Sequence, residues 1–167
     1  MNKRNIIFIG MPGAGKSSVG VILAKVLGYE FIDTDLVIQH REKRLLREII
    51  ADEGNEGFLA IENEVNATLE ANKSVIAPGG SAIYGKEAME HFKEIGTIVY
   101  LKLSYEDLAK RLGNLKGRGV VLKEGQTLKD LYDERSKLYE QYAEITVDES
   151  GRDIQGTILA LREQIGM

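Results

Sequence analysis

Cysteine and tryptophan are absent from the 167 residues, and proline occurs only twice. Without cysteine the chain has no disulfides and no thiolate ligands for a metal ion. No apolar run approaches the ~18 residues of a membrane span, and the run Ile6–Ile9 is too short for a secretion signal. A basic excess is missing too, because the net charge is −4, which argues against broad nucleic-acid binding. We therefore expect a cytoplasmic monomer with no membrane or nucleic-acid partner.

Short runs rich in β-branched residues alternate along the chain with stretches of helical periodicity. This alternation predicts an α/β fold, a mostly parallel sheet with helices on both faces. No linker or repeat interrupts the pattern, so we expect one domain over residues 1–167. The expected strands are Asn5–Ile9, Glu30–Asp33, Ser74–Ala77, Thr97–Leu101 and Ile145–Val147; the expected helices are Lys16–Leu27, Phe58–Leu69, Ser104–Leu112, Thr127–Tyr142 and Ile154–Ile165.

The segment Gly10–Ser17 reads GMPGAGKS and matches the P-loop pattern G-x-x-x-x-G-K-[ST] in full. It follows the first expected strand and opens the first expected helix, where backbone N–H groups can converge on phosphate oxygens. Lys16 would reach the β- and γ-phosphates, and the Ser17 hydroxyl would bind Mg²⁺. The motif thus predicts a nucleoside triphosphate site formed by Gly13, Ala14, Gly15, Lys16, Ser17 and Ser18.

Two carboxylates, Asp33 and Asp35, stand at the end of the second expected strand. Ligands of parallel sheets bind beyond the carboxyl ends of the strands, so these side chains should lie near the P-loop. One could help to hold the metal, and the other could orient or deprotonate an acceptor hydroxyl. Capping of a following helix is the alternative role for an aspartate at this place, and the two roles are compatible.

A glycine-rich connection, Gly113–Gln126, joins two expected helices and contains Arg118. From Lys110 to Lys123 the chain carries several basic residues and no acidic one. Such a segment is either a solvated charged loop or a mobile lid that closes over phosphates. Elsewhere Pro78–Ser81 permits close backbone approach to a ligand or forms a plain turn. Arg135, taken by itself, is most simply a surface arginine.

Taken together, these motifs resemble the shikimate kinase family in order and spacing over nearly the whole chain. The resemblance implies a three-layer α/β/α P-loop kinase fold, with a five-stranded parallel sheet and a mobile lid at about residues 113–126. It also implies transfer of phosphate from ATP, with Mg²⁺, to the 3-hydroxyl of shikimate in aromatic amino-acid biosynthesis. The residues that carry it are Gly10–Ser17, Phe31–Asp35, Gly54, Phe58, Glu62, Gly79, Gly80, Arg118, Arg135 and Tyr139.

The resemblance assigns a role to each matching position. Lys16, Asp35 and Arg118 would be catalytic, with Asp35 as the base and Arg118 closing from the lid onto the phosphates. Asp33, with Ser17, would lie at the magnesium ion. The nucleotide would also be bound by Arg111, stacked on adenine, and by Arg152, while the acceptor would be bound by Asp35, Phe58, Leu59, Gly79, Gly80, Ser81 and Arg135.

Three positions depart from the family pattern. Leu59 stands where the family has an arginine that grips the substrate carboxylate, Ser81 replaces a third glycine, and Gly119 replaces the proline after the lid arginine. The phosphoryl-transfer part is thus better preserved than the carboxylate-binding part. A kinase of the same build for another polyol or hydroxy acid is one alternative. A P-loop switch is another, although Asn72-Lys73-Ser74-Val75 lacks the aspartate of a guanine-reading motif.

Overall fold

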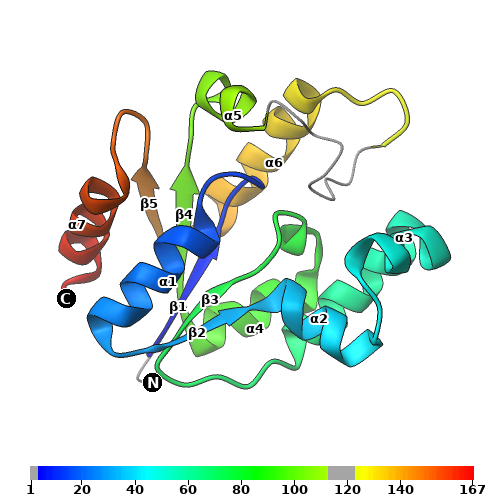
Figure 1. Cartoon of the computed structure of the whole chain (residues 1–167), viewed down its shortest axis with the longest axis horizontal. Helices are drawn as coiled ribbons and strands as arrows, with labels where there is room; N and C mark the ends of the chain where they lie inside the picture. The colour runs from blue at the N-terminus through cyan, green and yellow to red at the C-terminus, as the bar shows by residue number, and fades with distance from the viewer. Residues whose placement is uncertain (1–3, 113–122) are drawn as a thin grey trace.

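The computed structural model describes residues 4–112 and 123–167. Its five strands form one parallel sheet in the order β2-β3-β1-β4-β5, so the predicted α/β fold is confirmed. The strands end at the edge where the P-loop lies (Figure 1). The strands are β1 (Asn5–Ile9), β2 (Glu30–Asp33), β3 (Ser74–Ala77), β4 (Gly96–Lys102) and β5 (Ile145–Asp148).

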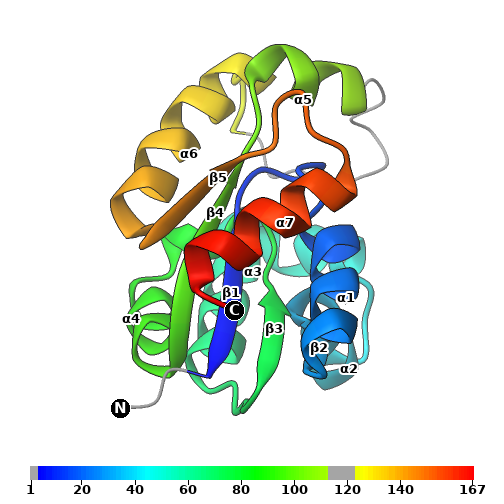
Figure 2. The same cartoon turned by 90° about the vertical axis from the view of Figure 1, so that its left-hand side faces the viewer.

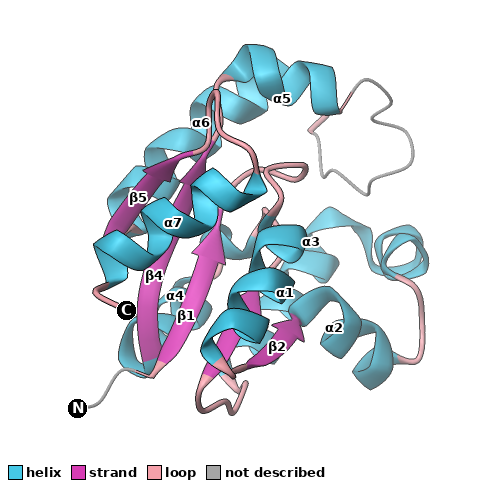
Figure 3. Ribbon diagram, turned by 60° about the vertical axis from the view of Figure 1, so that its left-hand side comes forward, coloured by secondary structure: helices cyan, strands magenta, loops and turns pink. Residues whose placement is uncertain are grey.

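Helices cover both faces of this sheet, with α1 and α7 in front of it and α4 and α6 behind in Figure 3. Figure 2 views the same layers after a quarter turn. The described helices are α1 (Lys16–Leu27), α2 (Thr34–Glu42), α3 (Leu46–Ala67), η1 (Ala82–Tyr84), α4 (Lys86–Ile95), α5 (Tyr105–Arg111), α6 (Leu128–Tyr142) and α7 (Ile154–Ile165). None of them is long and apolar enough to cross a membrane.

The central strand β1 explains why the core has two halves. Because neighbouring side chains of a strand point to opposite faces, Ile7 and Ile9 pack toward α4 and α6, while Ile6 and Phe8 pack toward α1 and α7. Every residue of β1 is buried, as expected for a strand covered on both sides. This continuous apolar run is the reason that the strand is evident in the sequence.

Two α-helices, α2 and α4, and the short 3₁₀ helix η1 are missing from the sequence prediction, and the start of α3 was placed too late at Phe58. In α2 only Thr34 and Ile38 are buried, so the charged residues around them conceal the apolar stripe. Helix α3 contains Gly54 with a φ of 74°, a non-helical residue at a kink that splits the helical period. Clear periodicity resumes only after this glycine.

A buried asparagine at the start of β1 joins three chain segments. The Asn5 amide donates to the carbonyls of Ala71 and Ile95, each at 2.9 Å, and its oxygen accepts from the Ser74 N–H at 3.0 Å. The side chain therefore ties together the chain ahead of β3 and the end of α4. Buried backbone groups that lose such partners are costly.

We expect Asn5→Ala to lower the free energy of unfolding by about 2–4 kcal/mol, because buried carbonyl and N–H groups lose their hydrogen-bond partner. Urea unfolding of both proteins measures the difference. Asn72→Ala, in an exposed loop, is the matched control and should change stability by less than about 0.5 kcal/mol. A loss of equal size in the two variants would contradict the account of Asn5.

Candidate active site

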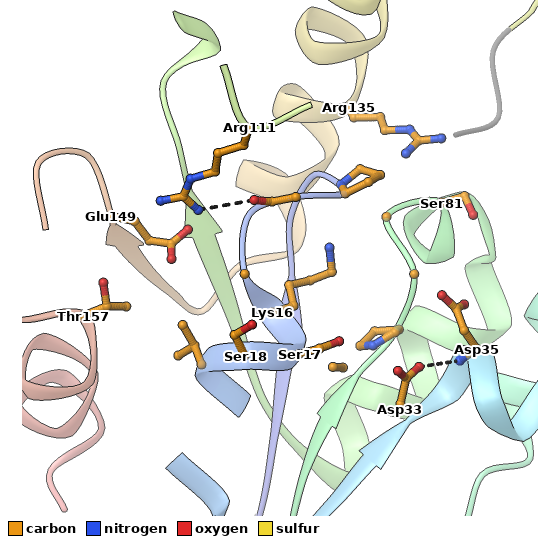
Figure 4. Close-up of a pocket in the computed structure, with 18 of the residues that line it drawn as sticks. Lys16, Ser17, Ser18, Asp33, Asp35, Ser81, Arg111, Arg135, Glu149 and Thr157 are labelled. Atoms are coloured by element: carbon orange, nitrogen blue, oxygen red, sulfur yellow. Dashed lines mark hydrogen bonds between the residues drawn. The ribbon is translucent and has the colours of Figure 1, made fainter. Parts of the chain in front are cut away.

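A cavity of about 760 Å³ opens at the carboxyl edge of the sheet. Its walls come from the P-loop, the start of α2, the turn after β3, helix α6 and the loop after β5 (Figure 4). These segments lie far apart in the sequence. The parallel strand order brings the P-loop, the start of α2, the turn after β3 and the loop after β5 together, because each follows the carboxyl end of a strand. The predicted site residues that line it are Gly13, Gly15, Lys16, Ser17, Ser18, Asp33, Asp35, Phe58, Gly79, Gly80, Ser81, Arg111, Arg135 and Arg152.

The P-loop glycines have backbone angles that other residues rarely adopt. Gly13 has a φ of 88°, and a Cβ placed on it would lie 2.8 Å from the Leu112 side chain. Gly15, with a φ of 85°, begins helix α1 without a side-chain cap among the described residues. The first N–H groups of α1 are thus open to an anion, as P-loop chemistry requires.

Lys16 is a buried cation beneath the P-loop. Its Nζ donates to the carbonyl oxygens of Gly10 at 2.8 Å and Met11 at 2.9 Å. Burial lowers the pKa of Lys16 to about 8, and the nearby carboxylate of Asp35 opposes that shift. A positive charge held in this way is well placed for the phosphates of a nucleotide.

The two strand-end aspartates serve structure and pocket together. Asp33 is the N-cap of α2, where its Oδ1 accepts from the Asp35 N–H at 3.0 Å. Helix α2 begins at Thr34, so Asp35 lies in a first helical turn rather than on an extended strand. The pKa of Asp35 is raised to about 6, chiefly by burial and then by the negative charge of Asp33, while the positive charge of Lys16 opposes the shift. The capping role and the pocket position therefore coexist.

Glu62 is a pocket residue to which the sequence assigned no role. It is 1% exposed on α3, and its Oε1 accepts from the Ser81 hydroxyl at 2.7 Å. A Cβ on Gly79 would lie 3.0 Å from an Asp35 oxygen and 3.1 Å from Glu62 Oε2, so both carboxylates border this glycine. Burial raises the pKa of Glu62 to about 7, opposed by the Ser81 hydrogen bond. Only the fold reveals this pairing, because α3 has many glutamates and most are exposed.

The isolated position of Arg135 in the sequence suggested a surface residue. The side chain is instead buried, with 1% of its surface exposed. Its Nη1 approaches Gly80 so closely that a Cβ there would lie 2.9 Å away, and its guanidinium lies 5.5 Å from the Tyr84 ring centre. Tyr139, one helical turn later, donates to the Gly80 carbonyl at 2.7 Å. Helix α6 thus fixes both the turn after β3 and a cation at the cavity wall.

The other predicted positions lie in different places. Leu59 packs in the apolar cluster between α2 and α3 rather than among the residues that line the cavity. Ala14 is fully buried within the P-loop. Arg111 lines the cavity and donates from Nη1 to the Gly13 carbonyl at 3.2 Å. Arg118 and most of the expected lid lie outside the described residues.

Comparison with known proteins identifies this arrangement. The model of the family described as shikimate kinase matches residues 12–165. The chain belongs to the shikimate kinase family. It is 34% identical over 154 residues to shikimate kinase 2 of Yersinia enterocolitica, covering 87% of this chain and 86% of that one.

Solved structures of the family agree with the fold. A shikimate kinase from Acinetobacter baumannii in complex with shikimate superposes with a TM-score of 0.80 and 33% identity, covering 98% of this chain and 91% of that one. The Aquifex aeolicus shikimate kinase gives a TM-score of 0.77 and 28% identity, with 97% and 96% covered. The predicted resemblance is thereby confirmed, and this member of the family is an ATP-dependent kinase that phosphorylates a hydroxyl group.

The buried Glu62 predicts a pH effect on stability. Its pKa is about 7 in the folded chain, above the ordinary glutamate value of 4.5, so the folded state binds the proton more tightly. The stabilisation from that proton is complete below the unfolded pKa and is lost as the pH rises through about 7. Glu62→Gln should therefore gain stability relative to the parent protein between pH 5 and pH 8, by on the order of 2 kcal/mol.

Urea unfolding at several pH values measures this difference, and Glu64→Gln, an exposed position on the same helix, is the control. A gap between parent and Glu62→Gln that stays constant with pH would contradict the assignment.

Proposed function

We propose that this kinase transfers the γ-phosphoryl group of ATP to the 3-hydroxyl of shikimate, with Lys16, Asp35 and Arg118 as its catalytic residues. The observation that carries the proposal is the shared cavity, in which a complete P-loop faces Asp35 across one continuous space. Membership in the shikimate kinase family supports the choice of acceptor. The proposal extends to one domain over residues 1–167 that works as a monomer in the cytoplasm, as the sequence predicts.

In this proposal Asp35 accepts the proton of the acceptor hydroxyl while that oxygen forms a bond to the γ-phosphorus of ATP. The bond from the γ-phosphorus to the bridging oxygen breaks, and ADP leaves with the electron pair. Lys16 stabilises the charge that develops on the phosphate oxygens, because its ammonium lies beneath the loop that holds them. Arg118 would add a second positive charge from the lid.

The cavity suits a magnesium ion bound with the nucleotide. A Mg²⁺ ion that enters with a nucleotide takes most of its ligands from phosphate oxygens and water. The Ser17 hydroxyl and the Asp33 carboxylate line the cavity and offer the oxygen ligands that Mg²⁺ prefers. Bound there, Mg²⁺ would neutralise the charge on the β- and γ-phosphates.

The acceptor would be held between Asp35, the Gly79–Gly80 backbone and Arg135, whose guanidinium can pair with a carboxylate. An assay of ADP release tests this directly with shikimate, quinate, a panel of sugar acids and neutral polyols, and with Lys16→Ala as the inactive control. Shikimate should give the highest kcat/KM of the panel. Turnover only with another compound, at a rate abolished in Lys16→Ala, would reject shikimate as the acceptor but retain the assignment of kinase activity.

A second acceptor class is favoured by the charges in the cavity. Among the described residues, the acceptor side holds Asp35 and Glu62 beside one guanidinium, that of Arg135, and Leu59 supplies no donor. Such a wall suits an acceptor with hydroxyl groups, which donate to carboxylates, better than an acceptor that carries a negative charge of its own. A neutral polyol is therefore the alternative acceptor.

Asp35→Asn should lower kcat by about 10²-fold or more, because the amide cannot take the hydroxyl proton. The KM for ATP should change little, since Asp35 lies on the acceptor side of the P-loop. Steady-state kinetics measures both constants, with the exposed Asp133→Asn as a control that keeps parental values. A large rise in the KM for ATP instead would assign Asp35 to the metal.

Leu59→Arg should lower the KM for shikimate by about tenfold, near the lower limit for one charged hydrogen bond. The arginine can extend from the α2–α3 cluster toward the cavity along its aliphatic stem. Ala60→Arg, on the exposed side of the same helix, adds the same charge and should leave the KM unchanged. An equal effect in both variants would show a general charge effect and remove Leu59 from the acceptor site.

A further inference from the structure

The loop after β5 brings a carboxyl group to the wall of the phosphate site. Val147 is buried and Asp148 is exposed, and the alternation of the strand continues to Glu149, which is 4% exposed and lines the cavity. The Glu149 N–H donates to the Lys102 carbonyl at 2.8 Å, and its own carbonyl accepts from the Arg152 N–H at 2.9 Å. The backbone therefore fixes the direction in which this side chain points.

The carboxyl group of Glu149 lies against the P-loop itself. A Cβ on Gly15 would lie 3.6 Å from Glu149 Oε1 and 3.8 Å from Arg111 Nη1, so the acid and the guanidinium flank the N-cap residue of α1. Figure 4 shows the carboxyl group between the Arg111 guanidinium and Thr157. The N–H groups that an anion would occupy follow this same glycine. Glu149 is thus a neighbour of the phosphate-binding backbone.

The charges around Glu149 determine how easily it ionises. The charged residues on the elements around it are Lys16 on α1, Arg111 on α5, Lys102 on β4, and Asp148, Arg152 and Asp153 on its own loop. Burial raises the pKa of Glu149 to about 7, and the negative charge of Asp148 adds to the rise, while Arg111 and Lys16 oppose it. The ammonium group of Lys102 pairs instead with Glu140 at 3.6 Å.

The ionised form of Glu149 depends on these positive charges. Its Oε2 is buried and has no hydrogen-bond partner among the described residues. A buried carboxylate that is short of hydrogen bonds is stable only while positive charge lies near it. In the protein without nucleotide, Lys16 and Arg111 supply that charge.

A nucleotide on the P-loop would reverse this balance. Its phosphates would neutralise Lys16 and would add negative charge beside Gly15, where the Glu149 carboxyl group lies. A like charge within about 6 Å disfavours the ionised form of a carboxyl group. A protonated carboxyl group no longer repels phosphate, and it gains an O–H donor.

We propose that Glu149 is a counter-ion of Lys16 and Arg111 in the nucleotide-free protein and takes up a proton from the solvent when a nucleotide binds. This inference rests on the proposed function only in taking a nucleoside triphosphate as the P-loop ligand. Binding raises the pKa of Glu149 above its value of about 7 in the free protein. Nucleotide affinity is therefore highest below about pH 7 and falls as the pH rises above it.

Infrared difference spectroscopy measures the protonation directly. The protein carries ¹³C at its glutamate carboxyl groups, which separates their absorption from that of aspartates. The ligand is the Mg²⁺ complex of the imido analogue of ATP, which is not hydrolysed, and no acceptor is present. At pH 7.5 its binding should produce a new carboxylic-acid C=O band in the parent protein. Glu149→Gln should lack this band.

Asp148→Asn is the matched control. It removes a negative charge one residue away, on the exposed side of the strand, and keeps an oxygen that can accept from the Ser150 N–H. The new band should therefore persist in this variant.

Calorimetric titration in buffers of different ionisation enthalpy counts the protons taken up with the same ligand. At pH 7.5 the parent protein should take up about half a proton more than Glu149→Gln. The two affinities should agree within about twofold at pH 6, where both side chains are neutral. At pH 8.5 Glu149→Gln should bind about threefold or more tightly than the parent, because only the parent must first protonate a carboxylate.

A new C=O band of equal size in the parent and in Glu149→Gln would place the proton on another acid and overturn the inference. Weaker binding by Glu149→Gln at every pH, with an unchanged proton count, would make Glu149 a direct contact of the nucleotide and also overturn it. The expected proton uptake without transfer to shikimate would leave the inference standing and reject the proposed function. A parent protein that binds no nucleotide would reject both.

Discussion

The site depends on one buried positive charge. Lys16 is held beneath the P-loop by the carbonyl oxygens of Gly10 and Met11, and carboxylates lie around it on both sides. Asp35 approaches from the acceptor side and Glu149 from the nucleotide side. Burial would otherwise disfavour a charged lysine, so these acids help to keep its ammonium ionised. In return, the lysine opposes the upward pKa shifts that burial imposes on Asp35, Glu62 and Glu149.

The strand order creates this balance of charges. With β1 at the centre, the P-loop that follows it lies between the segments after β3 and those after β4 and β5. Acids that follow β2 and β5, at opposite edges of the sheet, therefore reach the same lysine from two directions. Helix α6 completes the wall by carrying Arg135 and Tyr139 to Gly80. An ordinary parallel fold thus concentrates ionisable groups that are far apart in the chain.

Local signals in the sequence were enough for the P-loop, the strands and the family, because glycine spacing and continuous apolar runs survive without tertiary context. Helix α2 escaped prediction since its stripe is only Thr34 and Ile38 among charged residues. The burial of Glu62 and Glu149 at the cavity could not be predicted from the sequence for a different reason. Each is one acid among many in the sequence, and only burial beside a partner from a distant segment distinguishes it. Arg135 taken by itself suggested a surface residue on the same ground, and only the family resemblance assigned it to the acceptor site.

In the proposed reaction, the cavity brings a P-loop nucleotide together with an acceptor hydroxyl beside Asp35. Phosphorus NMR of a reaction with ATP, Mg²⁺ and shikimate tests it most directly, through the proton couplings that locate the new phosphate ester on the acceptor ring. We expect a single ester at the 3-hydroxyl, formed in equal amount to ADP and absent with Lys16→Ala. Esters spread over several hydroxyls, or ADP and free phosphate without any ester, would contradict it.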